Sequence, residues 1–352
     1  MKRTILMAAL LLSFFSVIHS QSKDDSKSLP TIAEKTQDFK QYPGYLTFYW
    51  DARQGKIWLE IDKWDEEFLY VNSLTAGIGS NDIGLDRGQL GGRRIVKFKR
   101  TGPKVLLIEP NYSYRAITDN AAERRSVEEA FAQSTLWGFQ VAAEEDRRVL
   151  VDLSDFCLRD AHNVVGTLKR RKQGDYKLDA SRSTFYPERT KNFPQNTELE
   201  VMLTFTGDSP GNWLRSVVPT PQAITVRQHH SFIQLPDDGY QPRAFDPRAG
   251  LFGIRYMDYA TPISEPILKR FIARHRLQKK NPEAAVSEPV EPIVYYVDAG
   301  APEPVRSALV EGAQWWSQAF AAAGYENAFQ VKILPKDADP LDVRYNVIQW
   351  VH

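Results

Sequence analysis

Histidine and cysteine are the side chains most suited to metal binding or acid–base work, and this chain has six histidines and one cysteine. Two of the histidines, His229 and His230, are adjacent in the segment QAITVRQHHSFIQL, which reads as a β-strand. Neighbouring side chains of a strand point to opposite faces of a sheet, so the two cannot readily hold one metal ion. We therefore expect structural or surface histidines here.

The single cysteine, Cys157, lies in LSDFCLRDA and has no partner for an internal disulfide. One interpretation is a thiolate that caps a catalytic metal. The other is a small buried apolar residue on a strand. We favour the second, because no Pro-Arg-Cys-Gly sequence surrounds Cys157.

A glycine-rich stretch, residues 75–94, could suggest a phosphate-binding loop. Gly77 and Gly79 give Gly-x-Gly, but Asp82 takes the third glycine position and no Gly-Lys-Ser/Thr follows. We expect a long loop between strands, in which glycines adopt positive φ.

Composition narrows the class of protein. Hydrophobic residues make up 42% of the 352 residues, enough for packed cores in two or three domains. Lys and Arg number 45 and Asp and Glu 44, a net charge of +1. Such a balance gives no overall field toward nucleic acid or acidic lipid, so we expect no nucleic-acid partner.

The N-terminus has the pattern of a secretory signal peptide. Lys2 and Arg3 precede an apolar run over residues 5–18, and Ser20 lies at the expected cleavage site. The run is too short for a membrane span. We predict a signal peptide over residues 1–20, an exported protein, and a polar, disordered leader over residues 21–41.

Residues 42–280 predict an antiparallel, β-rich domain. YLTFYW and KIWLEID, for example, flank the turn DARQG as in a β-hairpin. Two helices are expected inside this domain. One covers residues 126–139, where Ser126 and Glu129 have capping-box spacing. The other is a basic amphipathic helix over residues 266–280, whose charges we interpret as a solvated face rather than a membrane patch.

A second pattern follows a Pro- and Glu-rich linker over residues 281–292. IVYYV predicts a buried strand, residues 302–323 a helix ended by Gly324, and FQVKIL and NVIQWV two further strands. The chain is thus expected to be α+β, with an antiparallel β-rich domain before an incomplete α/β subdomain over residues 293–352.

PIVYYVDAGAPEPVRSALVEGAQWWSQAFAAAGY, followed by DVRYNVIQWVH, resembles the start of the catalytic domain in a family of bacterial exported zinc-dependent metalloproteases with a metzincin-like fold. GSNDIGLDRGQ, TKNFPQNTE, LPDDGYQPRAFDPRAG and RHRLQKKNP resemble that family's N-terminal region, a domain of unknown function. The resemblance covers nearly everything after Tyr42. It implies that the β-rich domain is an accessory to a metzincin-like protease subdomain.

The resemblance also implies a zinc ion, held in the full-length protein by a helix with His-Glu-x-x-His and by a third histidine. None of the histidines of this chain begins that motif: His19, His162, His229, His230, His275 and His352. We therefore assign no catalytic, cofactor-binding or metal-binding residue here. We expect this chain itself to bind no zinc.

Together these features predict the N-terminal portion of an exported zinc metalloendopeptidase, ending before the active site. A protein or peptide substrate is expected for the full-length protein. The alternative is a non-catalytic, β-rich extracytoplasmic binding module or a remnant. No membrane span is expected in either case.

Overall fold

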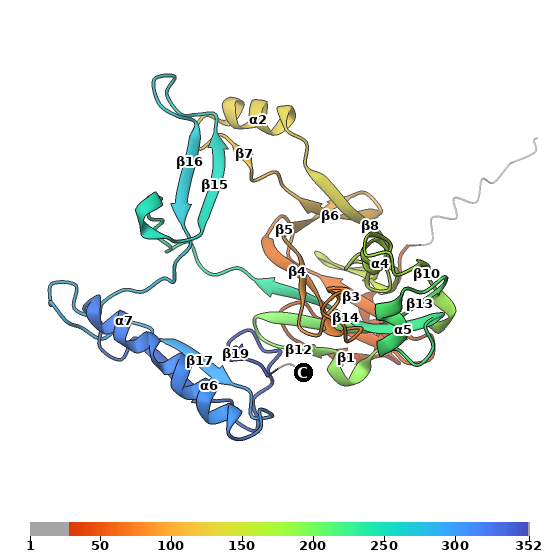
Figure 1. Cartoon of the computed structure of the whole chain (residues 1–352). Helices are drawn as coiled ribbons and strands as arrows, with labels where there is room; N and C mark the ends of the chain where they lie inside the picture. Colours follow the sequence, from red (N-terminus) through yellow and green to blue (C-terminus); the bar gives the residue numbers. More distant parts are fainter. Residues whose placement is uncertain (1–27, 351–352) are drawn as a thin grey trace, which may run out of the picture.

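The structure is a computed structural model that describes residues 28–350 (Figure 1). The expected signal peptide, the leader up to residue 27, and His352 lie outside the described residues. Three parts can be distinguished. We call residues 28–109 and 134–234 the body, residues 110–133 and 235–280 the arm, and residues 281–350 the C-terminal segment.

Antiparallel strands form the sheet of the body, which confirms the β-rich prediction. In the described residues the order is β1-β2-β3-β9-β8-β6-β5-β4-β14-β13-β10, and β11 and β12 also pair with β13. The hairpin around residues 51–55 is formed by β2 and β3. The strands are β1 (Lys40–Tyr42), β2 (Phe48–Asp51), β3 (Lys56–Ile61), β4 (Glu67–Ala76), β5 (Leu90–Thr101), β6 (Lys104–Glu109), β8 (Ser134–Glu145), β9 (Arg148–Asp152), β10 (Asp175–Leu178), β11 (Thr184–Phe185), β12 (Lys191–Asn192), β13 (Asn196–Asp208) and β14 (Ala223–Gln234).

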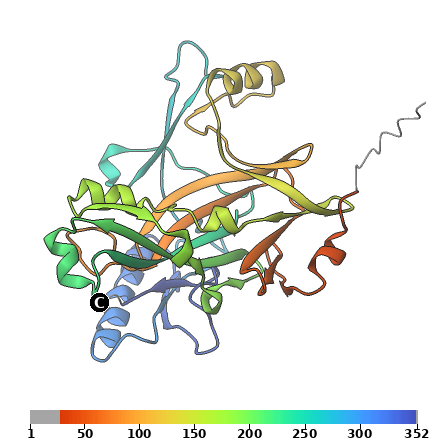
Figure 2. The same cartoon turned by 90° about the vertical axis from the view of Figure 1, so that its right-hand side faces the viewer.

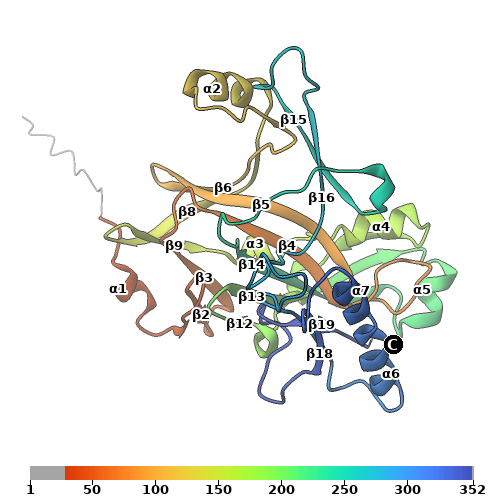
Figure 3. The same cartoon turned by 90° about the vertical axis from the view of Figure 1, so that its left-hand side faces the viewer.

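Loop contacts join the two ends of this sheet, so that it nearly closes on itself. The Tyr45 amide donates to the Phe193 carbonyl at 2.8 Å, and the Leu46 amide donates to Thr197 Oγ1 at 3.0 Å. Figures 2 and 3 show the long strands curving across the body, with the arm above and the C-terminal segment below. Short helices complete the body: α4 (Val164–Arg170), α5 (Asn212–Val217), η1 (Ala180–Arg182) and η2 (Pro187–Arg189).

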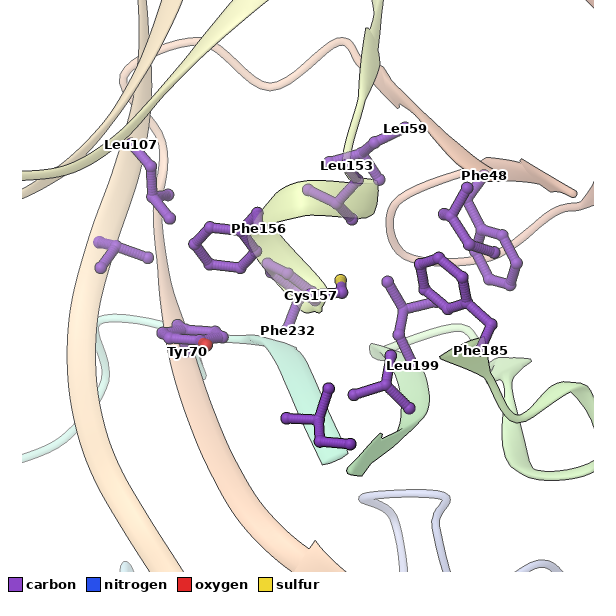
Figure 4. Close-up of a cluster of buried hydrophobic side chains, with 14 of the residues drawn as sticks. Phe48, Leu59, Tyr70, Leu107, Leu153, Phe156, Cys157, Phe185, Leu199 and Phe232 are labelled. Atoms are coloured by element: carbon purple, nitrogen blue, oxygen red, sulfur yellow. The ribbon is translucent and has the colours of Figure 1, made fainter. Parts of the chain in front are cut away.

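The core of the body surrounds the short helix α3 (Ser154–Cys157) (Figure 4). Phe156 is fully buried and packs against the rings of Tyr70 and Phe139, at centroid distances of 5.4 and 5.8 Å. Cys157 is buried as predicted, but it lies in this helix and not on a strand. Asp152 ends β9 by accepting from the Ser154 amide at 2.9 Å, which turns the chain inward. Burial raises the pKa of the Cys157 thiol, so it is not a reactive thiolate.

The glycine-rich stretch is a loop between β4 and β5, as expected. Gly79, Gly84 and Gly88 have positive φ, whereas Gly77 does not. Gly77 is required for another reason: a Cβ there would lie 2.2 Å from the Leu85 carbonyl oxygen. The loop buries Ile78, Ile83 and Leu85 in the core of the body, so its role is packing.

The leader and the first expected helix differ from prediction. A helix, α1 (Ile32–Thr36), replaces disorder in the described part of the leader, because Thr31 and Glu34 form a capping box and Ile32 packs into the body. The helix expected over residues 126–139 is instead α2 (Ala121–Ala130), and Asn120 is its N-cap. The Asn120 side chain accepts hydrogen bonds from two backbone amides at the start of the helix. The residues from 134 onward belong to β8, which pairs with β6.

The arm contains a second sheet, with β15 (Gly253–Asp258) between β16 (Leu268–Ile272) and β7 (Tyr114–Arg115). The prediction of an amphipathic helix over residues 266–280 is therefore wrong. Its apolar residues pair with β15 across a hairpin, and this pairing overrides the helical spacing. A short helical turn, η3 (Pro247–Ala249), precedes β15.

The C-terminal segment has the expected β-α-β order, with parallel strands β18-β17-β19. The expected helix is divided at Trp315 into α6 and α7, and Gly324 ends α7 with a φ of 83°. The elements are β17 (Ile293–Val297), α6 (Val305–Gln314), α7 (Trp316–Ala322), β18 (Phe329–Ile333) and β19 (Asn346–Ile348). Across the described residues, no helix has both the length and the apolar character that crossing a bilayer requires.

Candidate functional site at the junction of body and C-terminal segment

A cavity of 590 Å³ lies where the strands β4, β13 and β14 of the body meet residues 340–349 of the C-terminal segment. Its walls combine the two signs of charge. The charged residues that line it are Arg87, Arg189, Glu198, Arg227, His229, Asp298 and Asp342.

At the base of the cavity a buried histidine lies between two buried carboxylates. His229 Nδ1 is 3.0 Å from Glu200 Oε2, and His229 Nε2 is 2.5 Å from Glu198 Oε2. The strand register produces this arrangement, because Glu200 lies opposite His229 and Glu198 lies opposite Ser231. All three side chains are buried, so the cluster belongs to the interior of the protein.

The two carboxylates determine the protonation state of His229. Burial opposes the charged form of His229, but the hydrogen bonds and negative charges of Glu198 and Glu200 outweigh it and raise its pKa to about 9. Burial is likewise the largest influence on Glu200 and opposes its charged form, but the hydrogen bonds from His229 and Thr75 and the charges of His229 and Arg189 together outweigh it and lower the pKa. Arg189 Nε adds a second cation 3.0 Å from Glu200 Oε2. His229 is therefore an imidazolium that donates from both ring nitrogens.

These contacts define what the cluster can do chemically. An imidazolium with both protons donated to carboxylates cannot serve as a general base near neutral pH. Ser231 Oγ donates to Glu198 Oε2 at 2.6 Å, so its partner is a carboxylate and not a histidine. The arrangement is that of an ion-pair network that holds two strands and shapes the cavity floor.

Asn196 connects this network to the C-terminal segment. Its Nδ2 donates to Glu198 Oε1 at 2.6 Å and to the Leu341 carbonyl at 2.7 Å. Its Oδ1 accepts from the Val343 amide at 3.2 Å. Asn196 is fully buried, so these bonds have no water as an alternative partner. The cluster is thus physically continuous with the loop that closes the cavity.

His230 points to the opposite face of the sheet, as predicted for adjacent strand residues. Its Nδ1 lies 2.8 Å from the Tyr70 hydroxyl and its Nε2 2.9 Å from the Cys157 carbonyl. Burial and the nearby Arg159 charge lower its pKa to about 3, so it is neutral. Both histidines are structural, and neither lies at the surface.

The residues present do not fit a catalytic zinc. A zinc-bound histidine must be neutral and must offer a free ring nitrogen, and His229 meets neither condition. His162 is half-buried and contacts Asn72 and Gln89, and His275 is exposed. Within residues 28–350, no group of three or more His, Cys, Asp or Glu side chains has the geometry of a metal site.

The sequence alone did not identify the two carboxylates of the cluster. The signal was present, because Glu198 and Glu200 alternate in TELEVMLTF and so share one face of the expected strand. What the sequence lacked was the pairing of this strand with the strand of His229. That pairing brings together residues about 30 positions apart.

Fold and site together define a β-rich protein with a buried ionic cluster at its junction with a short α/β segment. Residues 88–280, more than half of the chain, match a family model described as "Domain of unknown function (DUF5117)", and the chain belongs to this family. Residues 29–77 match a second model, "Domain of unknown function (DUF5118)". No curated protein matches the chain, and no solved structure matches it.

Proposed function

We propose that this chain is the N-terminal portion of an exported zinc metalloendopeptidase. The body and arm would act as its accessory domain, and residues 293–352 would begin its metzincin-like catalytic domain. The motifs of residues 292–325 and 342–352 support this proposal through their resemblance to such proteases. The parallel order of β17, β18 and β19, with α6 and α7 beside them, is compatible with the start of an α/β domain.

The observation that carries the proposal is the apolar surface of the C-terminal segment. No residue of α6 or α7 is buried, and Trp315 and Trp316 are 64% and 63% exposed. A groove of 430 Å³ runs beside α7 and is lined by Tyr295, Trp316, Phe320, Phe329 and Ile348 among others. Large aromatic side chains contribute most when covered, so this surface is suited to further protein packing on it.

Zinc, when bound in the full-length family protein, would supply the activated water for peptide-bond hydrolysis. The residues described here would hold no zinc and would take no catalytic role. Their contribution would be to position the catalytic domain, through Asn196 and the ion pair between Lys191 and Asp339. The N-terminal pattern supports export, with signal peptide cleavage near Ser20.

A second candidate is a non-catalytic binding module for a peptide or another polar ligand outside the cytoplasm. The cavity of 590 Å³ with both signs of charge on its walls favours it. In that case the cavity itself would be the binding site, and no proteolysis would accompany it.

The coding sequence of the gene downstream of the His352 codon separates the two candidates. We expect an in-frame His-Glu-x-x-His there. The product extended through that motif should contain one zinc ion and cleave casein, and a Glu-to-Gln change in the motif should abolish cleavage while zinc remains. A stop codon directly after His352 would contradict the protease proposal and favour the binding module.

A further inference from the structure

The arm contains a sheet of three strands. These strands, β7, β15 and β16, form one layer that extends away from the body (Figure 1). Most residues of β15 and β16 are exposed or half-buried. In stable domains another layer normally covers at least one face of a sheet. The exposed sheet of the arm therefore has a face that such a layer could cover.

Three arginines share one face of this sheet. Arg255 and Arg270 are directly opposite in the β15–β16 pairing. Ala244 pairs with Phe271 on the other side of β16, so alternation places Arg243 on the same face as Arg270. We call Arg243, Arg255 and Arg270 the arginine face. All three are exposed.

Ion pairs to the arginine face are missing from the part of the chain that the structure describes. Among the described residues, no carboxylate forms an ion pair with any of these three guanidinium groups. Asp246, three residues after Arg243 in the sequence, forms its ion pair with Arg248. Like charges directly opposite on neighbouring strands destabilise a sheet, so the arrangement lacks the negative charge that would balance it.

The surroundings of the arginine face favour a polypeptide as the source of that negative charge. Arg270 stacks over the Phe245 ring at 3.9 Å, which holds a planar guanidinium ready for bidentate bonds to carboxylates. Residues 240–276 contain six arginines but one lysine, together with three tyrosines and three phenylalanines. Enrichment in Arg and aromatic residues with depletion of Lys is typical of protein–protein interfaces.

A membrane surface fits this geometry less well. Phe252, which is 89% exposed, lies before β15, and the fully exposed Ile263 lies in the connection after it. The six residues of β15 separate them, about 20 Å of extended chain, so the most exposed apolar side chains do not gather at one tip for insertion.

We propose that the arginine face of the arm binds a protein segment rich in carboxylate side chains. This inference does not depend on the proposed protease function, because it uses residues of the arm alone. The bound segment would place carboxylates against Arg255 and Arg270 and relieve the repulsion between them.

The test uses the full chain and a fluorescein-labelled peptide of alternating Glu and Leu. We expect saturable binding by fluorescence anisotropy, weakened by salt, and about tenfold weaker or worse in the double variant Arg255→Glu, Arg270→Glu. The matched control is Arg248→Glu, which changes an arm arginine already paired with Asp246 and should leave binding within about twofold. Unchanged thermal melting of the double variant would show that the arm remains folded.

Three results would overturn the proposal. The first is no change in peptide anisotropy when the protein is in 100-fold excess (about 100 μM protein over 1 μM peptide). The others are equal binding by the double variant and equal binding of a peptide in which Gln replaces Glu. Vesicles of phosphatidylcholine with phosphatidylglycerol test the alternative that the arginine face binds anionic lipid. Binding to these vesicles, lost in the double variant while the peptide fails to bind, would assign the arginine face to anionic lipid instead.

Discussion

The body and the C-terminal segment are both rich in aromatic and aliphatic residues, yet they use them differently. In the body, Phe156 is fully buried among other aromatic rings. In the C-terminal segment, Trp315 and Trp316 remain more than half exposed. Apolar composition therefore indicates where a core can form, but a core exists only where a second surface closes over it. The nearly closed sheet provides that surface in the body.

The largest loss of stability is expected from a substitution at the centre of the body. Phe156→Ala should lower the free energy of unfolding by about 3–5 kcal/mol, because it removes a ring from a closed core and leaves a cavity. Urea unfolding followed by tryptophan fluorescence measures this loss. A loss below about 1 kcal/mol would contradict the description of the core.

The buried ionic cluster should come next. His229→Gln removes the cation between Glu198 and Glu200, and we expect a loss of about 3 kcal/mol, since two buried carboxylates then face each other. The double variant His229→Gln, Glu198→Gln removes one of these charges and should recover part of the loss. If the double variant is no more stable than the single one, the carboxylates do not repel as described.

Stability should also depend on pH through the two adjacent histidines, in opposite directions. The pKa of His229 is raised to about 9 in the folded state, so its contribution is full below pH 6.5 and is lost as pH rises toward 9. The pKa of His230 is lowered to about 3, so its contribution is full above pH 6.5 and declines as pH falls.

Urea unfolding between pH 5 and 10 should therefore show maximal stability near pH 6.5, with a fall above it that is absent in His229→Gln. The slope from one proton is at most about 1.4 kcal/mol per pH unit. An identical fall above pH 6.5 in the variant would show that another group is responsible.

A smaller effect is expected at the junction. Asn196→Ala removes the bonds to Leu341 and Val343, with a loss of about 1–3 kcal/mol from buried groups left unpaired. Amide exchange of residues 340–346 should accelerate. Asn192→Ala is the matched control, because Asn192 bonds to Tyr42 and Leu46 inside the body and should leave residues 340–346 unchanged.

The smallest effect should come from the C-terminal segment itself. Trp316→Ala should change the free energy of unfolding by less than about 0.5 kcal/mol, because the side chain is 63% exposed. The same substitution in a buried position would cost several times more. A loss comparable to that of Phe156→Ala would mean that Trp316 is covered in solution.

Local patterns in the sequence predicted the features that depend on neighbouring residues. The hairpin after Asp51, the loop around Gly79 and the opposite faces of His229 and His230 follow from alternation and turn chemistry. The predictions that are wrong concern segments whose secondary structure depends on pairing with a distant part of the chain. The apolar spacing of residues 266–280 fits a helix as well as a strand, and only pairing with β15 selects the strand.

The same limit applies to the candidate site. The two carboxylates beside His229 come from another strand, and Asn196 contacts residues 145 to 147 positions away. Such partners are set by how the sheet curves and closes, which no local window of the sequence contains. The sequence alone therefore leaves open whether His229 is a structural or a surface histidine.

The most direct test of this account is hydrogen–deuterium exchange of the full chain, followed by mass spectrometry. It asks whether the nearly closed body is a stable core and whether α6 and α7 of the C-terminal segment lack a covering layer. Amides of β4, β13 and β14 should exchange slowly, and those of α6 and α7 should exchange through local opening at least about a hundredfold faster. Equal protection of α6 and β13 would contradict this account, because helices without a buried face could not be so protected.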